Sequence, residues 1–280
     1  IERYTSIKSA GFCNIAHQGP DGYSLLPRLI GKEADDVHIV TGGLNHFAWV
    51  LAMKDKKSGR DLLPDVQRYV TNGDWSEQPD SIRRELAIMR SYCEEFGGIA
   101  AGSVDHHAEY MPPRPDIHYA SHPPYHGNED ERRQRLEQLR EIAAGAADWR
   151  PLFAHRNWEH PVDLAVALHT GRRTPFDMLN IPNRGYVPGL PAGRIVEVPA
   201  WAEDGDIKGV RVPSLPSGVE RICRLVSDVH EWAAEAAVNG DLSAAGRAIE
   251  GDPAIVDKKG ARHAFDRMLK AHADLLPQFK

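Results

Sequence analysis

Apolar residues recur at helical spacing along one long stretch near the C-terminal end of the sequence. Val219, Ile222, Val226, Val229 and Ala233 would lie on a single face of one helix. Such a helix is stable mainly because its apolar face packs against other elements. The fold must therefore include a core that covers this face, and 280 residues suffice for one large core or two small ones.

Other segments also have helical patterns. Residues 74–96 begin polar, then place apolar residues at helical spacing, and a pair of glycines ends the run. Residues 128–147 predict a charged helix rich in Glu, Arg and Leu, and two shorter helices are expected at about 242–249 and 260–276. The chain is therefore helix-rich toward its C-terminus.

Strand patterns are fewer and shorter. Ile39-Val40 and the run from Phe47 to Met53 predict strands around a kink at Gly42-Gly43, and residues 194–199 predict another short strand. Residues 112–128 are rich in Pro, His and Tyr and should form a loop. No repeat or clear linker divides the chain, so the pattern favours a single α+β unit.

Composition and charge exclude several classes of protein. The net charge is −6 and no run of Lys or Arg forms a basic stripe, which argues against a nucleic-acid partner. The sequence shows no apolar stretch of transmembrane length and no secretory leader, so no membrane partner is expected. Three widely spaced cysteines suggest no disulfide framework, and we expect a cytoplasmic location.

Cys13 and His46 are candidate metal ligands, and each has an asparagine beside it. Thiolate and imidazole both bind divalent transition metals, although the spacing is not that of a structural zinc site. The carboxamides of Asn14 and Asn45 are able to hold a substrate hydroxyl, since they both donate and accept. The alternatives are a buried cysteine, a core histidine and two turn asparagines, and residue spacing alone favours them.

Residues 102–113, GSVDHHAEYMPP, concentrate titratable side chains just after a Gly-rich break. The candidates are Asp105, His106, His107, Glu109 and Tyr110. Such residues are candidate bases and hydroxyl binders. A solvated turn with incidental charge is the alternative.

A third segment, NIPNRGYVPGLP with RIVEVP after it, spans residues 180–199. Asn183 and Gly185 suggest a tight turn, and Gly185 is suited to a positive φ angle. The segment is a candidate for substrate contact through its backbone, but a turn that fixes the following strand is the favoured interpretation for most of it.

Four segments together resemble the C-terminal half of the family 4 glycoside hydrolases. They are FCN at 12–14, GGLNHFAWV at 42–50, HHAEYMP at 106–112 and NIPNRGYVPGLPAGRIVEVP at 180–199, in that order. The resemblance covers nearly the whole chain. It implies the substrate- and metal-binding domain, here residues 1–280, of an enzyme with lactate/malate-dehydrogenase-like architecture and a mixed or antiparallel sheet.

The resemblance also implies a mechanism that differs from the usual pair of carboxylates. Family members use NAD and a divalent metal, commonly Mn²⁺. NAD takes hydride from C3 of the sugar, which makes the C2 proton acidic, and the metal polarises the C3 carbonyl. A base then removes the C2 proton, the glycosidic oxygen leaves by elimination, water adds and the hydride returns.

Carried over by position, the resemblance assigns roles to individual residues. Cys13 and His46 would hold the metal, and Tyr110 would be the C2 base with Asp105 as the alternative. Asn14 would lie near the scissile bond, where a carboxamide has no useful pKa for proton donation.

Four other residues are implied as substrate contacts. Asn45 would bind sugar hydroxyls, His17 would assist the leaving group, and His107 and Asn183 are further candidates. The glycoside is expected to be an α-galactoside or a hexuronide.

The expected N-terminal half of the family has no counterpart in this sequence. No GxGxxG motif is present, so no residue is assigned to NAD. The chain would be a fragment, one subunit of a split enzyme whose partner chain supplies the NAD domain, or a degenerate protein. A homo-oligomer is also expected. A non-catalytic sugar- or metal-binding or assembly subunit remains the alternative function, and a metal-free lactate/malate-type dehydrogenase is a further rival.

Overall fold

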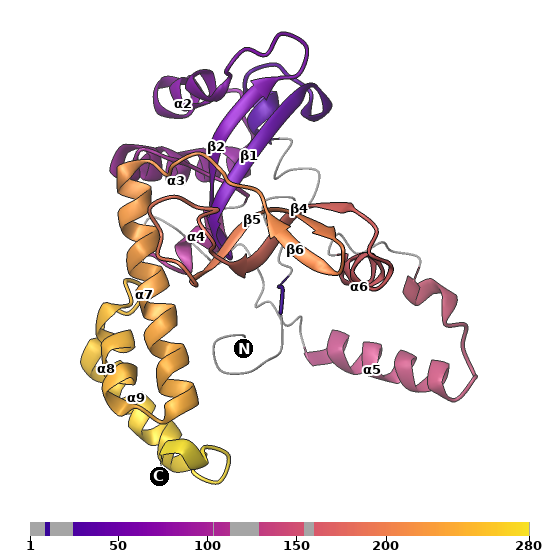
Figure 1. Cartoon of the computed structure of the whole chain (residues 1–280), viewed down its shortest axis with the longest axis vertical. Coiled ribbons are helices and arrows are strands. Elements are labelled where there is room, and N and C mark those ends of the chain that lie inside the picture. The colour runs from indigo at the N-terminus through magenta and orange to yellow at the C-terminus, as the bar shows by residue number, and fades with distance from the viewer. Residues whose placement is uncertain (1–8, 12–24, 103, 113–128, 154–159, 280) are drawn as a thin grey trace. The chain divides into compact units, whose positions relative to one another are not determined.

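The computed structural model describes residues 9–11, 25–102, 104–112, 129–153 and 160–279 (Figure 1). The chain divides into two compact units, one formed by residues 1–113 with 159–280 and the other by residues 114–158. The smaller unit contains helix α5 (Glu129–Ala143), whose charged composition matches the predicted helix at 128–147, and the 3₁₀ helix η4 (Arg150–Phe153).

The larger unit is built around one antiparallel sheet with the order β3-β2-β1-β5-β4, to which β6 adds by pairing with β5. Its strands are β1 (Val37–Leu44), β2 (Phe47–Asp55), β3 (Ile99–Ala100), β4 (Thr174–Pro182), β5 (Ile195–Glu203) and β6 (Asp206–Gly209). The predicted α+β class with an antiparallel sheet is confirmed.

The strands are longer than their sequence patterns predicted. β1 continues through Gly42-Gly43 to pair fully with β2, and the irregularity lies between Val40 and Thr41. Gly43 is required for another reason, since a Cβ atom there would lie 2.5 Å from the backbone oxygen of Phe47. The strand predicted at 194–199 is the first part of β5, whereas β4 and β6 were not predicted.

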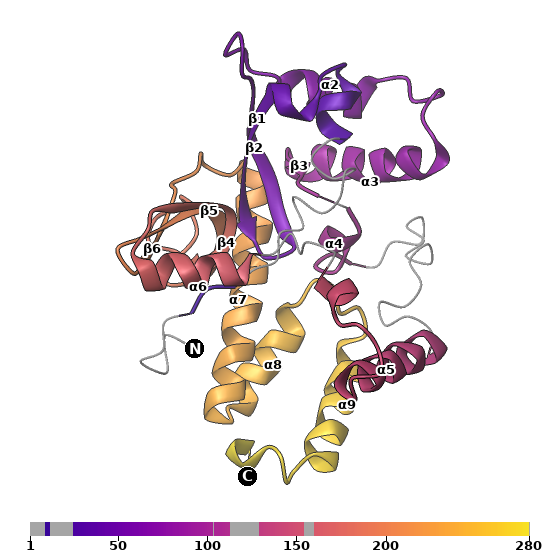
Figure 2. The same ribbon diagram turned by 90° about the vertical axis from the view of Figure 1, so that its right-hand side faces the viewer.

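Helices cover the sheet and extend beyond it (Figures 1 and 2). In chain order they are η2 (Ala34–Asp36), α2 (Leu63–Asn72), α3 (Asp80–Phe96), α4 (Val104–Ala108), α6 (Pro161–Thr170), α7 (Ser217–Asn239), α8 (Leu242–Gly251), α9 (Lys258–Ala271) and η5 (Pro277–Phe279). Gly97 ends α3, as predicted, and it adopts the left-handed conformation. Among the described residues, no helix combines the length and apolarity needed to cross a bilayer.

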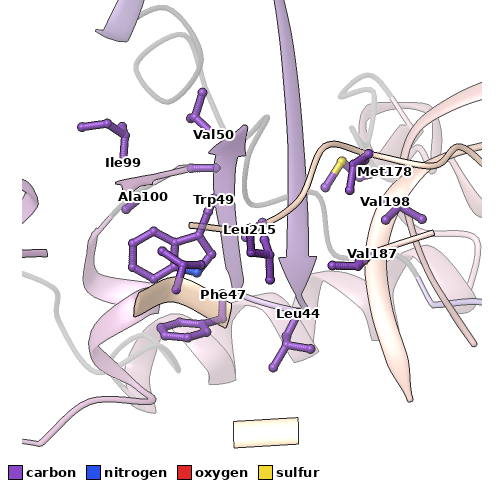
Figure 3. Packing of buried hydrophobic residues seen from close by; sticks show 14 of the residues in the cluster. Leu44, Phe47, Trp49, Val50, Ile99, Ala100, Met178, Val187, Val198 and Leu215 are labelled. Carbon is purple, nitrogen blue, oxygen red and sulfur yellow. The ribbon is translucent and has the colours of Figure 1, made fainter. Parts of the chain in front are cut away.

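The core lies where α3 packs against β2 and β3 and α7 packs against β1. Figure 3 shows Phe47 and Trp49 of β2 near Leu44 and Leu215 in this core. Val219, Val226 and Val229 of α7 are buried as the apolar face predicted, while Ala233 is exposed. The core therefore anchors both strands of the hairpin at the end where its turn lies.

Candidate metal and substrate site

The turn of the β1–β2 hairpin presents Asn45 and His46. Leu44 pairs with Phe47 at the end of the ladder, so only these two residues form the turn. His46 has a φ angle of 59°, a left-handed conformation that costs a non-glycine residue on the order of 1 kcal/mol or more. Leu44 and Phe47 are almost fully buried and hold the turn in place. Strain of this kind is typical of functional positions.

Helix α4 is held against β2 by His107. This ring is fully buried, and its Nε2 donates a hydrogen bond to the backbone oxygen of Ala48 at 2.7 Å. The ring also packs against Phe47, Trp49 and Tyr92, with centroid separations of 5.2, 5.1 and 6.2 Å. These contacts fix α4 against β2 and place the ring of His107 in the core, where it is not accessible to a substrate.

His46, His106 and Glu109 form a cluster of potential metal ligands. Nδ1 of His46 lies 3.1 Å from Oε2 of Glu109, and the rings of His46 and His106 meet edge to face at 4.9 Å. One ligand atom from each of the three residues lies within 4.8 Å of the others. Two imidazoles and a carboxylate suit a divalent transition metal such as Mn²⁺, Fe²⁺ or Zn²⁺.

The sequence signalled this cluster only in part. His46 was predicted to be a ligand, whereas His106 and Glu109 were noted only as titratable side chains. Their spacing of three positions is the signal that could have found them, because it places two side chains on the same side of a helical turn. A backbone hydrogen bond of 3.2 Å from Glu109 to His106 forms that turn.

Asn45 is the first of three hydrogen-bonded side chains, Asn45, Asn180 and Glu197, which extend from the hairpin turn into the sheet. Nδ2 of Asn180 donates to Oδ1 of Asn45 at 2.9 Å and approaches Oε2 of Glu197 at 3.3 Å. Asn180 is 8% exposed and Glu197 only 1%. Burial raises the pKa of the Glu197 carboxyl to about 8, although the hydrogen bond from Asn180 opposes the shift. Neither residue was singled out from the sequence.

The segment at residues 9–11 joins the sheet next to these three hydrogen-bonded side chains. Gly11 forms an isolated antiparallel bridge with Asn180, with hydrogen bonds of 2.9 Å in both directions. Cys13, Asn14 and His17 lie outside the residues that the structure describes.

Tyr110 and Asp105, the two candidate bases, both lie in or directly after α4. Tyr110 is half-buried, with its ring 5.2 Å from that of Phe47 and 5.7 Å from that of His230, which belongs to α7 and was not predicted. Asp105 lies within α4, and its side chain is outside the described part.

Asn183 is buried, and its side chain is committed to a turn. Its Nδ2 donates to the backbone oxygens of Val187 and Leu190, and its Oδ1 accepts from the backbone N–H of Gly185 and Val187. These bonds fit the structural alternative, in which the segment fixes the strand that follows.

A family model described as "Family 4 glycosyl hydrolase C-terminal domain" matches residues 41–255. The chain belongs to this family. The match includes the hairpin turn, the HHAEY segment and the polar chain at Asn180 and Glu197, so the resemblance drawn from the sequence motifs is confirmed.

Curated relatives of this family 4 chain include enzymes with different substrates. It is 27% identical over 288 residues to an α-galactosidase of Bacillus subtilis (strain 168), covering 99% of the chain and 63% of that enzyme. It is 25% identical over 294 residues to an α-galacturonidase of the same organism, covering 95% of the chain and 62% of that enzyme. The chain thus spans less than two thirds of the length of these relatives.

Solved structures agree with the fold. The crystal structure of the Bacillus subtilis protein lplD matches with a TM-score of 0.71 at 23% identity, covering 94% of this chain and 63% of lplD. A 6-phospho-α-glucosidase from gut microorganisms, solved in complex with NAD and Mn²⁺, matches with a TM-score of 0.60 at 19% identity, covering 93% and 60% of the two chains. These likenesses establish the fold of the family 4 chain.

Proposed function

We propose that this chain is the metal- and substrate-binding part of an NAD-dependent glycosidase that acts on an α-galactoside or a hexuronide. The observation that carries the proposal is the meeting of His46, His106 and Glu109 beside Asn45 at one strained hairpin turn. Membership of family 4 and the α-galactosidase and α-galacturonidase relatives support the choice of reaction and substrate.

His46 and Cys13 are the metal ligands in this proposal, with His106 and Glu109 available to complete the donor set. Gly11 is bonded to Asn180, whose side chain contacts Asn45 next to His46. Cys13 follows Gly11 by two positions in the sequence, and this closeness along the chain supports its assignment.

The chain's own residues then orient the sugar and move a proton. A bound NAD would supply a hydride acceptor for C3 of the sugar, and a bound divalent metal would supply a Lewis acid for the resulting carbonyl. Asn45 orients sugar hydroxyls, and Tyr110, the residue after Glu109, removes the C2 proton, with Asp105 as the alternative base. Asn14 contacts the sugar near the scissile bond, and His17 assists the leaving group.

The nucleotide has no assigned residues in this chain. We propose that it is held by residues outside these 280, on the same polypeptide or on a partner chain, and that the enzyme works as a cytoplasmic oligomer. The relatives' extra length supports this division, because the chain covers 63% of the α-galactosidase. A non-catalytic sugar- or metal-binding or assembly subunit is the second candidate, because the ligand cluster of His46, His106 and Glu109 needs no nucleotide to hold a metal.

Metal and substrate binding are tested separately. Calorimetric titration of the chain with Mn²⁺ should show one site that is lost in His46→Ala and Cys13→Ser and retained in His263→Ala, which alters an exposed histidine of α9. Hydrolysis of p-nitrophenyl galactosides and hexuronides should then require both NAD and Mn²⁺ in the protein that carries the nucleotide site. Hydrolysis without NAD would refute the mechanism, and sugar binding without turnover would favour the second candidate.

A further inference from the structure

A carboxyl group occupies the middle of the sheet. Glu197 of β5 pairs with Gly43 of β1 on one side and with Asn180 of β4 on the other. Its neighbours Val196 and Val198 are fully buried, as suits a central strand. A branched apolar side chain at this position would stabilise the strand more, because burying a carboxyl group removes its hydration and so carries a free-energy penalty. The polar group at Glu197 therefore needs an explanation beyond strand stability.

Among the described residues, the amide of Asn180 connects Glu197 to the site. The Nδ2 group of Asn180 has two hydrogens, and two acceptors face it: Oδ1 of Asn45 at 2.9 Å and Oε2 of Glu197 at 3.3 Å. Two acceptors fix both the rotation and the flip of the amide, whereas one acceptor would leave it free to turn. The carboxamide of Asn45 is held by that same amide, directly before His46 in the turn.

We propose that Glu197 is a positioning residue of the site: it fixes the amide of Asn180, which in turn fixes the carboxamide of Asn45 beside His46. The effect of Glu197 on sugar and metal binding rests on the proposed function. The hydrogen bonds that link Glu197, Asn180 and Asn45 do not depend on it. Outer-shell partners of this kind commonly change metal affinity by about 10- to 100-fold when they are removed.

The electrostatics of the site agree with this role. Burial raises the pKa of Glu197 to about 8, so the group is mainly protonated near pH 7 and brings no full charge into the sheet. A glutamine has nearly the same shape as a protonated glutamic acid and keeps an oxygen that accepts from Asn180. Glu197→Gln should therefore preserve the arrangement, whereas Glu197→Leu removes the acceptor at similar volume.

The test uses side-chain amide NMR of the metal-free chain, so that it depends on neither metal nor sugar. Glu197→Leu should shift the amide signals of Asn180 and Asn45 and speed their hydrogen exchange, while Glu197→Gln leaves both near their wild-type positions. Val198→Ala is the matched control, because it alters a buried side chain next to Glu197 on the same strand. Unchanged Asn45 signals in Glu197→Leu would overturn the proposal.

A second measurement on the wild type guards against a variant that fails to fold. Between pH 5 and 9 the side-chain signals of Asn180 and Asn45 should move together with one midpoint near 8, and this transition should be absent in Glu197→Gln. Independent behaviour of the two signals would contradict the proposed link from Glu197 through Asn180 to Asn45.

Mn²⁺ affinity should fall about 10-fold or more in Glu197→Leu and stay within about twofold in Glu197→Gln. A wild-type chain that binds no Mn²⁺ would refute the proposed function but leave the NMR result standing.

Discussion

Nδ1 of His46 lies 3.1 Å from Oε2 of Glu109, although 63 positions separate the two residues in the sequence. The contact joins the hairpin turn to the residue that follows α4. It brings together the GGLNHF and HHAEY segments, which the sequence offered as separate candidates.

A substitution of Glu109 tests whether its contact with His46 belongs to the metal site. Glu109→Gln keeps the shape of the side chain but removes its charge, and a ligand carboxylate loses much of its affinity for a hard cation when neutral. We expect Mn²⁺ binding to weaken about 10-fold by calorimetry, in line with the loss of a supporting group at a metal site. Glu94→Gln, on the exposed side of α3, is the control and should bind as the wild type does. Equal affinities for both variants would remove Glu109 from the donor set.

His107 should matter for stability. His107→Ala removes a buried ring and its hydrogen bond to Ala48, which should lower the free energy of unfolding by about 2–4 kcal/mol. Urea denaturation followed by tryptophan fluorescence measures this change, since Trp49 packs against the ring. His263→Ala, at an exposed site, should change stability by less than about 0.5 kcal/mol. A His107→Ala chain as stable as the wild type would show that the ring does not hold α4.

The raised pKa of Glu197 makes stability depend on pH. The folded chain binds this proton more tightly than the unfolded chain, since the pKa rises from 4.5 to about 8 on burial. The contribution to the free energy of unfolding is therefore complete below pH 4.5, declines as the pH rises toward 8 and is constant above it. The loss is on the order of a few kcal/mol.

Urea denaturation from pH 5 to 9 measures that loss. Other groups titrate in the same range, so the decisive quantity is the difference between wild type and Glu197→Gln. The variant should show a shallower decline with pH, because its amide does not ionise. Parallel curves for the two proteins would mean that Glu197 does not carry this proton.

Local patterns predicted much of the fold. The apolar face of α7 at Val219, Val226 and Val229 is buried as expected. Apolar residues at helical spacing indicate which side of a helix faces the core. β4 was missed because Thr174–Pro182 is bounded by prolines and contains polar residues at Asp177 and Asn180, which weaken a strand pattern. Its place in the sheet comes from pairing with β5, a long-range contact that no local window records.

The site was predictable one segment at a time. Asn45 and His46 could be singled out because a motif carries them, and the HHAEY segment because its side chains are dense. Glu197 could not, since a single carboxyl in an apolar strand gives no sign of its partner. Only the register of β4 and β5 brings Asn180 and Glu197 together, and only the hairpin brings Asn45 to them.

The central claim is that an imidazole of the hairpin turn holds a divalent cation. The most direct measurement is pulsed EPR of Mn²⁺ bound to the chain, which detects nitrogen coupled to the metal. The wild type should show histidine nitrogen coupling that is reduced in His46→Ala, where His106 is the remaining imidazole of the cluster, and unchanged in the control His263→Ala. Unaltered nitrogen coupling in His46→Ala, or Mn²⁺ bound with no nitrogen at all, would contradict the account.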